Sequence, residues 1–375
     1  AIKENTIFFA SRSWPFISLI FALLFTTVVT EFFSSIEGEK KMNINELIIT
    51  SGAPIIFLIV YNTLDTEKRI SFALMLGSVF FSISCIFVIL QYFNIDLAWQ
   101  IRGLFGFRVE GGEIESQFLA RSKPFGLNYY SINFSYSIAL MFPYVFLQSI
   151  SYNSYKWIYK IIFPIYLIAL IMLNVKSVIL GVGIFFITRW IRLNSRMRIF
   201  KIFIILFSLV IIINSLNLIL PYLSPSTITS FLVRIPLALM GFILLWNHPL
   251  GLPNNVGYHE LAEYYLPLIN HIPLSESVLK FTPHNYFLTY GISNFGIISI
   301  FIAILIFILP IFIAFKVKHN TYYNNINVQS VALGWGIIVY IVNDMLHNGG
   351  PLMGHQLYFF ICAIIYKLHT LKIKI

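Results

Sequence analysis

The feature that most constrains this chain is a series of long apolar segments. About ten of them approach the roughly 20 residues that a helix needs to cross a bilayer. Hydrophobic residues make up 58% of the chain and charged residues 11%, whereas soluble proteins contain about 25% charged residues. No soluble fold can bury so much apolar surface, so the sequence predicts an all-α polytopic membrane protein. The expected spans are residues 14–33, 47–61, 71–93, 129–150, 157–173, 177–190, 202–220, 286–315, 331–345 and 356–367.

Two stretches between these spans are long, although residues 1–375 are expected to form a single membrane domain. The first covers residues 94–128, and the second covers residues 221–285, between the seventh and eighth spans. Within the second, residues 230–246 are apolar and carry one charge, that of Arg234. This pattern predicts a helix that lies at the interface or re-enters the membrane.

Lys and Arg are distributed unevenly along the chain, and they concentrate in the cytoplasmic segments of membrane proteins. Placing the N-terminus inside puts most of the 25 basic residues in the cytoplasm, with the densest cluster at residues 189–201. Both termini are then cytoplasmic, and residues 94–128 and 221–285 face outside. Most of the eight histidines also fall outside, so any chemistry is expected on that face.

Several classes of function lack support in the sequence. The net charge of +10 is explained by membrane orientation, so no nucleic-acid partner is expected. Cys85 and Cys362 lie in apolar runs and are typical of small core residues. No phosphate-binding glycine loop, HExxH helix or outer Asp-x-Asp pair is present, so neither a cofactor nor a metal is expected. Asp344 is the one acid close to the interior of a late span, which weakens a transporter interpretation without removing it.

Three cations stand at positions where charge is costly. Arg121, Lys176 and Arg234 lie at the end of an apolar segment or within one, on the predicted outer side. Charge at this depth is usually functional, and the guanidinium group suits phosphate oxygens. Anionic lipid headgroups are the alternative ligand, and this explanation is at least as good for Arg102, Arg108 and Lys280. A lysine that extends toward the interface would explain Lys176 equally well.

The segment around His284 combines a proline with two polar residues just before a span. Pro283 precedes His284 and Asn285, which places both at a helix N-terminus that faces outside. The positive end of the helix dipole lowers the pKa of a histidine, so His284 can accept a proton. The alternative is that the two residues only cap the helix at the interface.

Four motifs in this order resemble the superfamily of bacterial O-antigen polymerases (Wzy-type) and O-antigen ligases. They are Arg121-Ser-Lys-Pro-Phe-Gly-Leu-Asn-Tyr-Tyr, Asn174-Val-Lys-Ser, Arg234 followed by Trp246-Asn-His-Pro-Leu-Gly, and His284-Asn-Tyr-Phe-Leu followed by Gly291 and Gly296. The resemblance covers roughly residues 121–315. Two departures are Lys176, where the family commonly has arginine, and Asn128-Tyr-Tyr, where Asn-Pro-Asn is often seen.

This resemblance implies a GT-C-like helical fold in the bacterial inner membrane and an inverting glycan transfer that uses no metal. The donor would be an undecaprenyl-pyrophosphate-linked oligosaccharide, and the reaction would take place on the periplasmic face. Arg234, Lys176 and Arg121 would bind the pyrophosphate, and Arg234 and His284 would be catalytic. Asn285, Tyr286, Asn128 and Tyr258 would position the substrates.

The resemblance favours a polymerase, which joins repeat units, over a ligase, which transfers the glycan to lipid A–core. The segment from His284 to Gly296 is more similar to polymerases. A chain-length regulator would be a possible protein partner, besides the bilayer. A polysaccharide or lipid transporter is the alternative from another class, although it predicts paired ionisable residues at mid-membrane.

Overall fold

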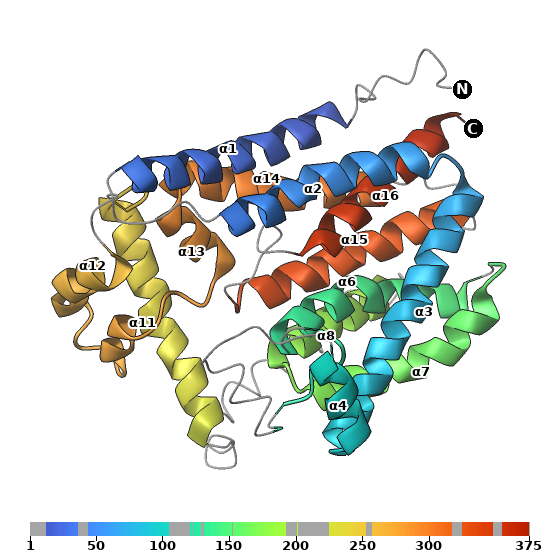
Figure 1. The fold of residues 1–375 in the computed structure, drawn as a ribbon, viewed down its shortest axis with the longest axis horizontal. Coiled ribbons are helices and arrows are strands. Elements are labelled where there is room, and N and C mark those ends of the chain that lie inside the picture. Colours follow the sequence, from blue (N-terminus) through green and yellow to red (C-terminus); the bar gives the residue numbers. More distant parts are fainter. Residues whose placement is uncertain are drawn as a thin grey trace. The chain divides into compact units, whose positions relative to one another are not determined.

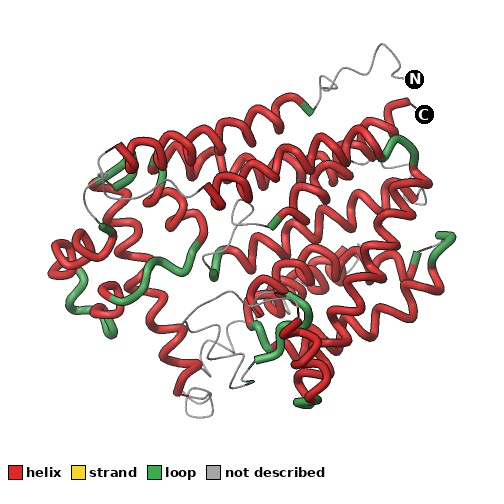
Figure 2. The backbone as a smooth tube through the Cα atoms, viewed as in Figure 1, coloured by secondary structure: helices red, strands yellow, loops and turns green. Residues whose placement is uncertain are grey.

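The computed structural model describes residues 13–36, 44–104, 121, 123–128, 131–151, 153–192, 201, 225–252, 257–316, 325–347 and 355–374. Within these ranges every regular element is a helix, and none is a strand (Figure 2). The predicted all-α class is therefore confirmed for the described part of the chain.

Helices overlap every predicted span except residues 202–220, which lie outside the described residues. They are α1 (Trp14–Ile36), α2 (Ile44–Thr63), α3 (Glu67–Tyr92), α6 (Ser131–Ile150), α7 (Lys156–Leu173), α8 (Lys176–Arg192), α13 (Tyr286–Ser293), α14 (Gly296–Phe315), α15 (Asn325–Asp344) and α16 (Gln356–Lys374). Among the described residues, four of these helices are long and apolar enough to cross a membrane: α3, α7, α14 and α15. The chain is thus suited to a membrane, and the count of about ten spans stays a prediction.

The predicted span 286–315 differs from the structure, because two helices occupy it. Helix α13 ends at Ser293, and α14 begins at Gly296 in a left-handed conformation (φ 56°). Pro310 lies inside α14 and is not the point of the break. The apolar character of the run alone does not reveal such a break, since α13 and α14 are both apolar.

The chain divides into two compact units. The first unit holds Ala1–Val28, Asn43–Val182 and Ile302–Ile375, and the second holds Val29–Met42 and Gly183–Phe301. Helices α1, α8 and α14 each contribute to both units.

In the first unit, α6 packs against α15 and α7, while α3 packs against α7 and α2 packs against α16 (Figure 1). Small residues allow the close approach of helices that membrane proteins favour. A Cβ atom at Gly336 of α15 would overlap the Leu140 carbonyl oxygen of α6. Large aromatic side chains such as Tyr136, Tyr144 and Tyr340 fill the remaining space and are fully buried.

In the second unit, α11 (Pro225–Asn247) packs against α13, α12 (Tyr258–Tyr265) and the 3-10 helix η4 (Ser275–Leu279). A second 3-10 helix, η3 (Leu266–Leu268), follows α12 directly. The core of this unit includes Leu237 and Leu244 of α11 with Ala262, Val278 and Leu288. Residues 230–246 are thus helical, as predicted from their composition.

Candidate functional site

Arg234 occupies an unusual position in the apolar helix α11. Its side chain is half-buried, and its Nε atom is buried without a hydrogen-bond partner in the part of the chain that the structure describes. A buried donor without a partner is costly, especially on a charged group. An anion supplied from outside the chain would satisfy this atom.

His284 lies on the segment that joins η4 to α13, close enough to Arg234 for the arginine charge to affect it. Arg234, Leu237 and Gly241 share one face of α11, because they are three and seven residues apart. Cβ of a side chain at Gly241 would lie 3.2 Å from Pro283 and from Leu288, so this face meets the segment that carries His284. The His284 pKa lies below its ordinary value because the ring is partly buried and because Arg234 is positively charged. At neutral pH the His284 imidazole is therefore neutral and can accept a proton.

Asn285 is the N-cap of α13, and its Oδ1 accepts a hydrogen bond of 3.2 Å from the Leu288 amide. The Thr289 hydroxyl also donates to the Pro283 carbonyl at 2.6 Å. These two bonds fix the backbone on both sides of His284. The capping role that the sequence left open for Asn285 is therefore present, and it orients the histidine.

Two tyrosines predicted to position substrate differ in exposure. Tyr286 is almost completely buried and its ring lies 5.4 Å from that of Tyr290, so it belongs to the packing of α13. Tyr258 begins α12 and is half-buried. Its hydroxyl has no hydrogen-bond partner among the described residues, and burial raises its pKa. Tyr258 therefore offers a further unused polar group in the same unit as Arg234.

The third and fourth sequence motifs dock onto each other. The Ile297 amide donates to the Pro249 carbonyl at 2.9 Å, and the Leu252 amide donates to the Ile292 carbonyl at 3.1 Å. Gly251 has a φ of 96°, and a Cβ atom there would overlap the Asn294 carbonyl oxygen. This contact holds the turn after α11 against the break between α13 and α14, which explains where the apolar run is interrupted.

Alanine at Gly251 is expected to destabilise the second unit. The left-handed conformation costs about 1–3 kcal/mol for a residue with a side chain, and the overlap with Asn294 adds to this cost. Gly257 provides a matched control, because a Cβ atom there meets open space. The melting temperature of the purified protein in detergent should fall for Gly251→Ala and stay unchanged for Gly257→Ala. Equal melting temperatures for the two variants would contradict this account.

In the first unit, Arg121 is exposed, has a φ of 49°, and pairs with Asp96. Its Nη1 atom also lies 3.4 Å from the Asn94 side-chain oxygen. Asp96 begins α4 (Asp96–Leu104), a helix that the sequence analysis did not anticipate within residues 94–128. A pyrophosphate bound at Arg121 would therefore compete with an acidic partner.

The loop after Arg121 is fastened to the end of α3. The Gln91 side-chain oxygen accepts hydrogen bonds from the Phe125 and Gly126 amides at 2.9 and 2.8 Å, and Arg102 Nε donates to the Asn128 carbonyl at 2.7 Å. Arg102 thus stabilises the loop between Arg121 and Asn128. Asn128 lines a cavity of about 370 Å³ whose other walls are mostly apolar, among them Phe80 and Phe81.

Lys176 is exposed and begins α8, next to a network that sequence reasoning missed. The buried Ser177 hydroxyl lies 2.6 Å from Asn343 Oδ1 and 2.9 Å from His347 Nε2. Asn343 also donates to Ser135 at 2.9 Å. The network joins three helices and fixes the first turn of α8, and with it the position of Lys176. Ser135, Ser177 and Asn343 are polar residues within apolar spans, and this pattern was the sequence signal for such a network.

Asp344 is fully buried at the end of α15. The Tyr136 hydroxyl lies close to it, but the carboxylate forms no hydrogen bond of normal geometry with any described residue. A charged carboxylate is expensive in such a place. Like Arg234, Asp344 is therefore an ionisable group with side-chain atoms that lack a hydrogen bond of normal geometry within the described part of the chain.

The residues predicted to bind pyrophosphate or to act in catalysis are divided between the two units. Arg121 and Lys176 belong to the first, and Arg234 and His284 belong to the second. The structure places His284 within reach of the Arg234 charge in the second unit. Comparison of the chain with protein-family models, with curated proteins and with solved structures finds no match.

Proposed function

We propose that the protein is an O-antigen polymerase that joins undecaprenyl-pyrophosphate-linked oligosaccharide repeat units on the periplasmic face of the bacterial inner membrane. The observation that carries the proposal is the pair in the second unit: a half-buried Arg234 with an unsatisfied Nε, beside a His284 that is neutral at neutral pH. Arg234 suits an anionic leaving group, and His284 suits the proton of an acceptor hydroxyl. The proposal includes ten spans, a GT-C-like fold and cytoplasmic termini.

The reaction needs one bond formed and one bond broken. The hydroxyl oxygen of the acceptor sugar attacks the anomeric carbon of the donor, and the bond from that carbon to the phosphate oxygen breaks. His284 takes the hydroxyl proton, and the electron pair leaves with undecaprenyl pyrophosphate. Arg234 stabilises the charge that develops on this leaving group, since a fixed cation is most effective where water is excluded.

The first unit contributes to binding in this scheme. Lys176 and Arg121 hold the diphosphate of one substrate, and Arg121 exchanges Asp96 for that diphosphate. The cavity beside Asn128 suits the start of an isoprenoid chain, because most of the side chains that line it are apolar. Tyr258 and the other aromatic side chains of the second unit suit the faces of sugar rings.

Deleting the gene in a strain that makes O-antigen tests the proposed function. Loss of a polymerase leaves lipid A–core with one repeat unit on a lipopolysaccharide gel, and the plasmid-borne gene restores the ladder. Loss of a ligase leaves bare core, and that pattern would replace the polymerase by the ligase. An unchanged ladder would contradict both glycan transferases.

Asp344 favours one alternative function, that of a proton-coupled transporter of a polysaccharide or lipid. An unpaired acid at membrane depth is typical of such proteins. The polymerase proposal predicts a normal ladder for Asp344→Asn, because the amide keeps the shape and leaves the transfer residues intact. A transporter would lose activity and leave repeat units undetected at the cell surface. Surface labelling of the glycan, with expression of the variant checked by immunoblot, measures the difference.

A further inference from the structure

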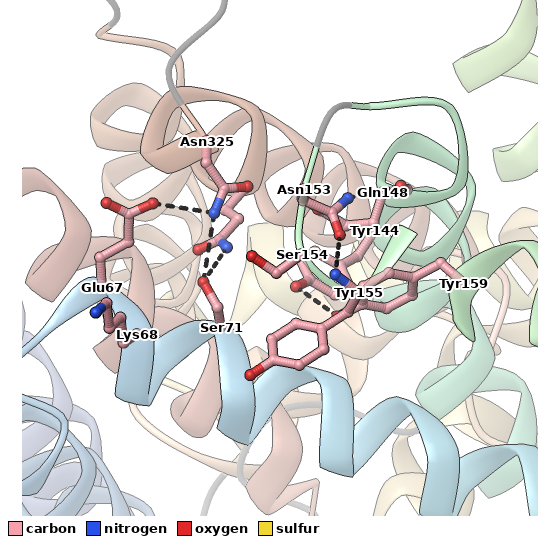
Figure 3. A pocket seen from close by; sticks show the side chains of 11 residues that line it. Glu67, Lys68, Ser71, Tyr144, Gln148, Asn153, Ser154, Tyr155, Tyr159 and Asn325 are labelled. Carbon is pink, nitrogen blue, oxygen red and sulfur yellow. Dashed lines mark hydrogen bonds between the residues drawn. The ribbon is translucent and has the colours of Figure 1, made fainter. Parts of the chain in front are cut away.

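The first unit contains a cavity of about 340 Å³ that the proposed transfer does not use. It lies where α3 and α15 begin and where α6 turns into α7 (Figure 3). Its volume falls within the roughly 300–1,000 Å³ that small-molecule sites occupy. Asn128 precedes the start of α6, and Lys176 adjoins Ser177, which contacts Asn343 near the end of α15. The cavity lies at the other ends of α6 and α15, so it is separate from these first-unit residues.

The cavity wall is built from a hydrogen-bonded set of amide and hydroxyl side chains. Asn325 Nδ2 donates to Glu67 at 3.0 Å, and Gln329 Nε2 donates to Ser71 at 2.6 Å. On the other side, the hydroxyls of Tyr144 and Tyr159 lie 3.0 Å apart. These bonds hold the lining side chains in place without any ligand.

Three amide groups in this wall remain incompletely satisfied. The side-chain oxygens of Asn325 and Gln329 and the side-chain nitrogen of Gln148 are buried without a hydrogen-bond partner among the described residues. Gln148 and Gln329 are each 1% exposed. Buried polar groups normally have partners. Terminal amide torsions are broad, so small rotations present these atoms to a bound molecule.

The charges at the cavity indicate which class of molecule fits. Lys68 and Glu67 are adjacent in sequence and both line it, so the wall has one cation and one acid. The two charges balance, so the wall offers no net positive charge that would bind a phosphate or a carboxylate. Free amide donors and acceptors beside phenol rings instead match a neutral molecule with many hydroxyl groups.

We infer that this cavity is a binding site for a neutral polyhydroxylated small molecule, of the size of a monosaccharide. The inference does not rest on the proposed transfer reaction. The surrounding basic residues Lys68, Arg69, Lys156 and Lys160 place this end of the first unit in the cytoplasm by the positive-inside rule. The site therefore senses or stores a soluble sugar on the side opposite to the proposed chemistry.

The test uses the full chain in lipid nanodiscs, which avoids detergents that carry sugar headgroups. D-glucose, D-galactose, N-acetyl-D-glucosamine and glycerol serve as probes at millimolar concentration, in saturation-transfer NMR and in thermal-shift measurements. At least one of them should bind and raise the melting temperature of the wild type. Gln329→Leu should weaken that binding by about tenfold or more, because it removes one buried amide.

Asn62→Leu is the matched control, because Asn62 is exposed in the same unit and its amide only reaches the Leu58 carbonyl. It should bind the probe as the wild type does. If Gln329→Leu fails to fold, Gln148→Leu is measured in its place. Absence of binding by all four probes, unchanged binding in the glutamine variants, or binding of inorganic phosphate alone would each overturn the inference. None of these outcomes bears on the gene-deletion phenotype, so the two proposals fail separately.

Discussion

Arg234→Ala is expected to lower polymerisation by about 100- to 1,000-fold, the usual effect of removing one group that stabilises a developing charge. Cells that carry this variant should show lipid A–core with a single repeat unit in place of the ladder. Arg234→Lys should retain part of the activity, because it keeps the charge and loses the planar fork. A lipopolysaccharide gel from the complemented deletion strain measures both effects.

The same substitution should leave the folded state as stable as before or more stable. The Arg234 Nε atom has no partner among the described residues, so alanine leaves no other buried group unsatisfied. It also removes a charge from an apolar helix. A loss of activity without a loss of melting temperature therefore distinguishes a catalytic arginine from a structural one.

Lys280→Ala is the control for charge, because Lys280 is an exposed cation of the same unit. It should give a normal ladder. A normal ladder for Arg234→Ala would remove Arg234 from the mechanism. Loss of the ladder together with a large fall in melting temperature would make its role structural.

His284→Gln is expected to reduce the transfer rate by about 100- to 10,000-fold, the range for loss of a general base. Glutamine keeps hydrogen bonding at the site but accepts no proton at ordinary pH. His271 is exposed in the same unit, and His271→Gln should have no effect. Transfer between lipid-linked repeat units in membrane vesicles gives the rates. Equal rates for His284→Gln and the wild type would exclude proton transfer by this residue.

The pH profile gives an independent readout for His284. Burial and the Arg234 charge lower its pKa from the ordinary value of about 6.5. The base is protonated, and activity is lost, only as the pH falls below that ordinary value. Arg234→Gln removes one of the two causes, so the acidic limb of its residual activity should move to higher pH. An acidic limb at the same pH in both proteins would contradict the proposed pair.

The helices of this protein are largely predictable from its sequence, because their determinants are local. The apolar runs predicted nine helical regions in the described part of the chain, and residues 230–246 were predicted as helical from composition alone. The free energy of transfer into lipid adds residue by residue along a run. Tertiary contacts are not needed to recognise it.

The candidate site was predictable only in part. Arg234 and His284 stood out because charge in an apolar helix and a polar pair at a helix start are local signals. Their proximity was not predictable, since it depends on how α11 packs against the segment before α13. The pairing of Arg121 with Asp96 was missed for the same reason, because the two residues are 25 positions apart.

The sequence by itself determined that the chain forms helices apolar enough to cross a membrane. It also determined which ionisable groups are costly to bury, since hydrophobicity and charge belong to each residue. The tertiary structure decided which of those groups are satisfied. It paired Ser177 with Asn343, which lies 166 residues away. Among the described residues it left Arg234 Nε, the Asp344 carboxylate oxygens and one amide atom of each of three cavity side chains without a hydrogen-bond partner. It also broke the eighth apolar run at Gly296, where the turn at Pro249 docks. Hydrogen bonds and steric overlap act only between atoms in contact, and chain folding alone determines those contacts.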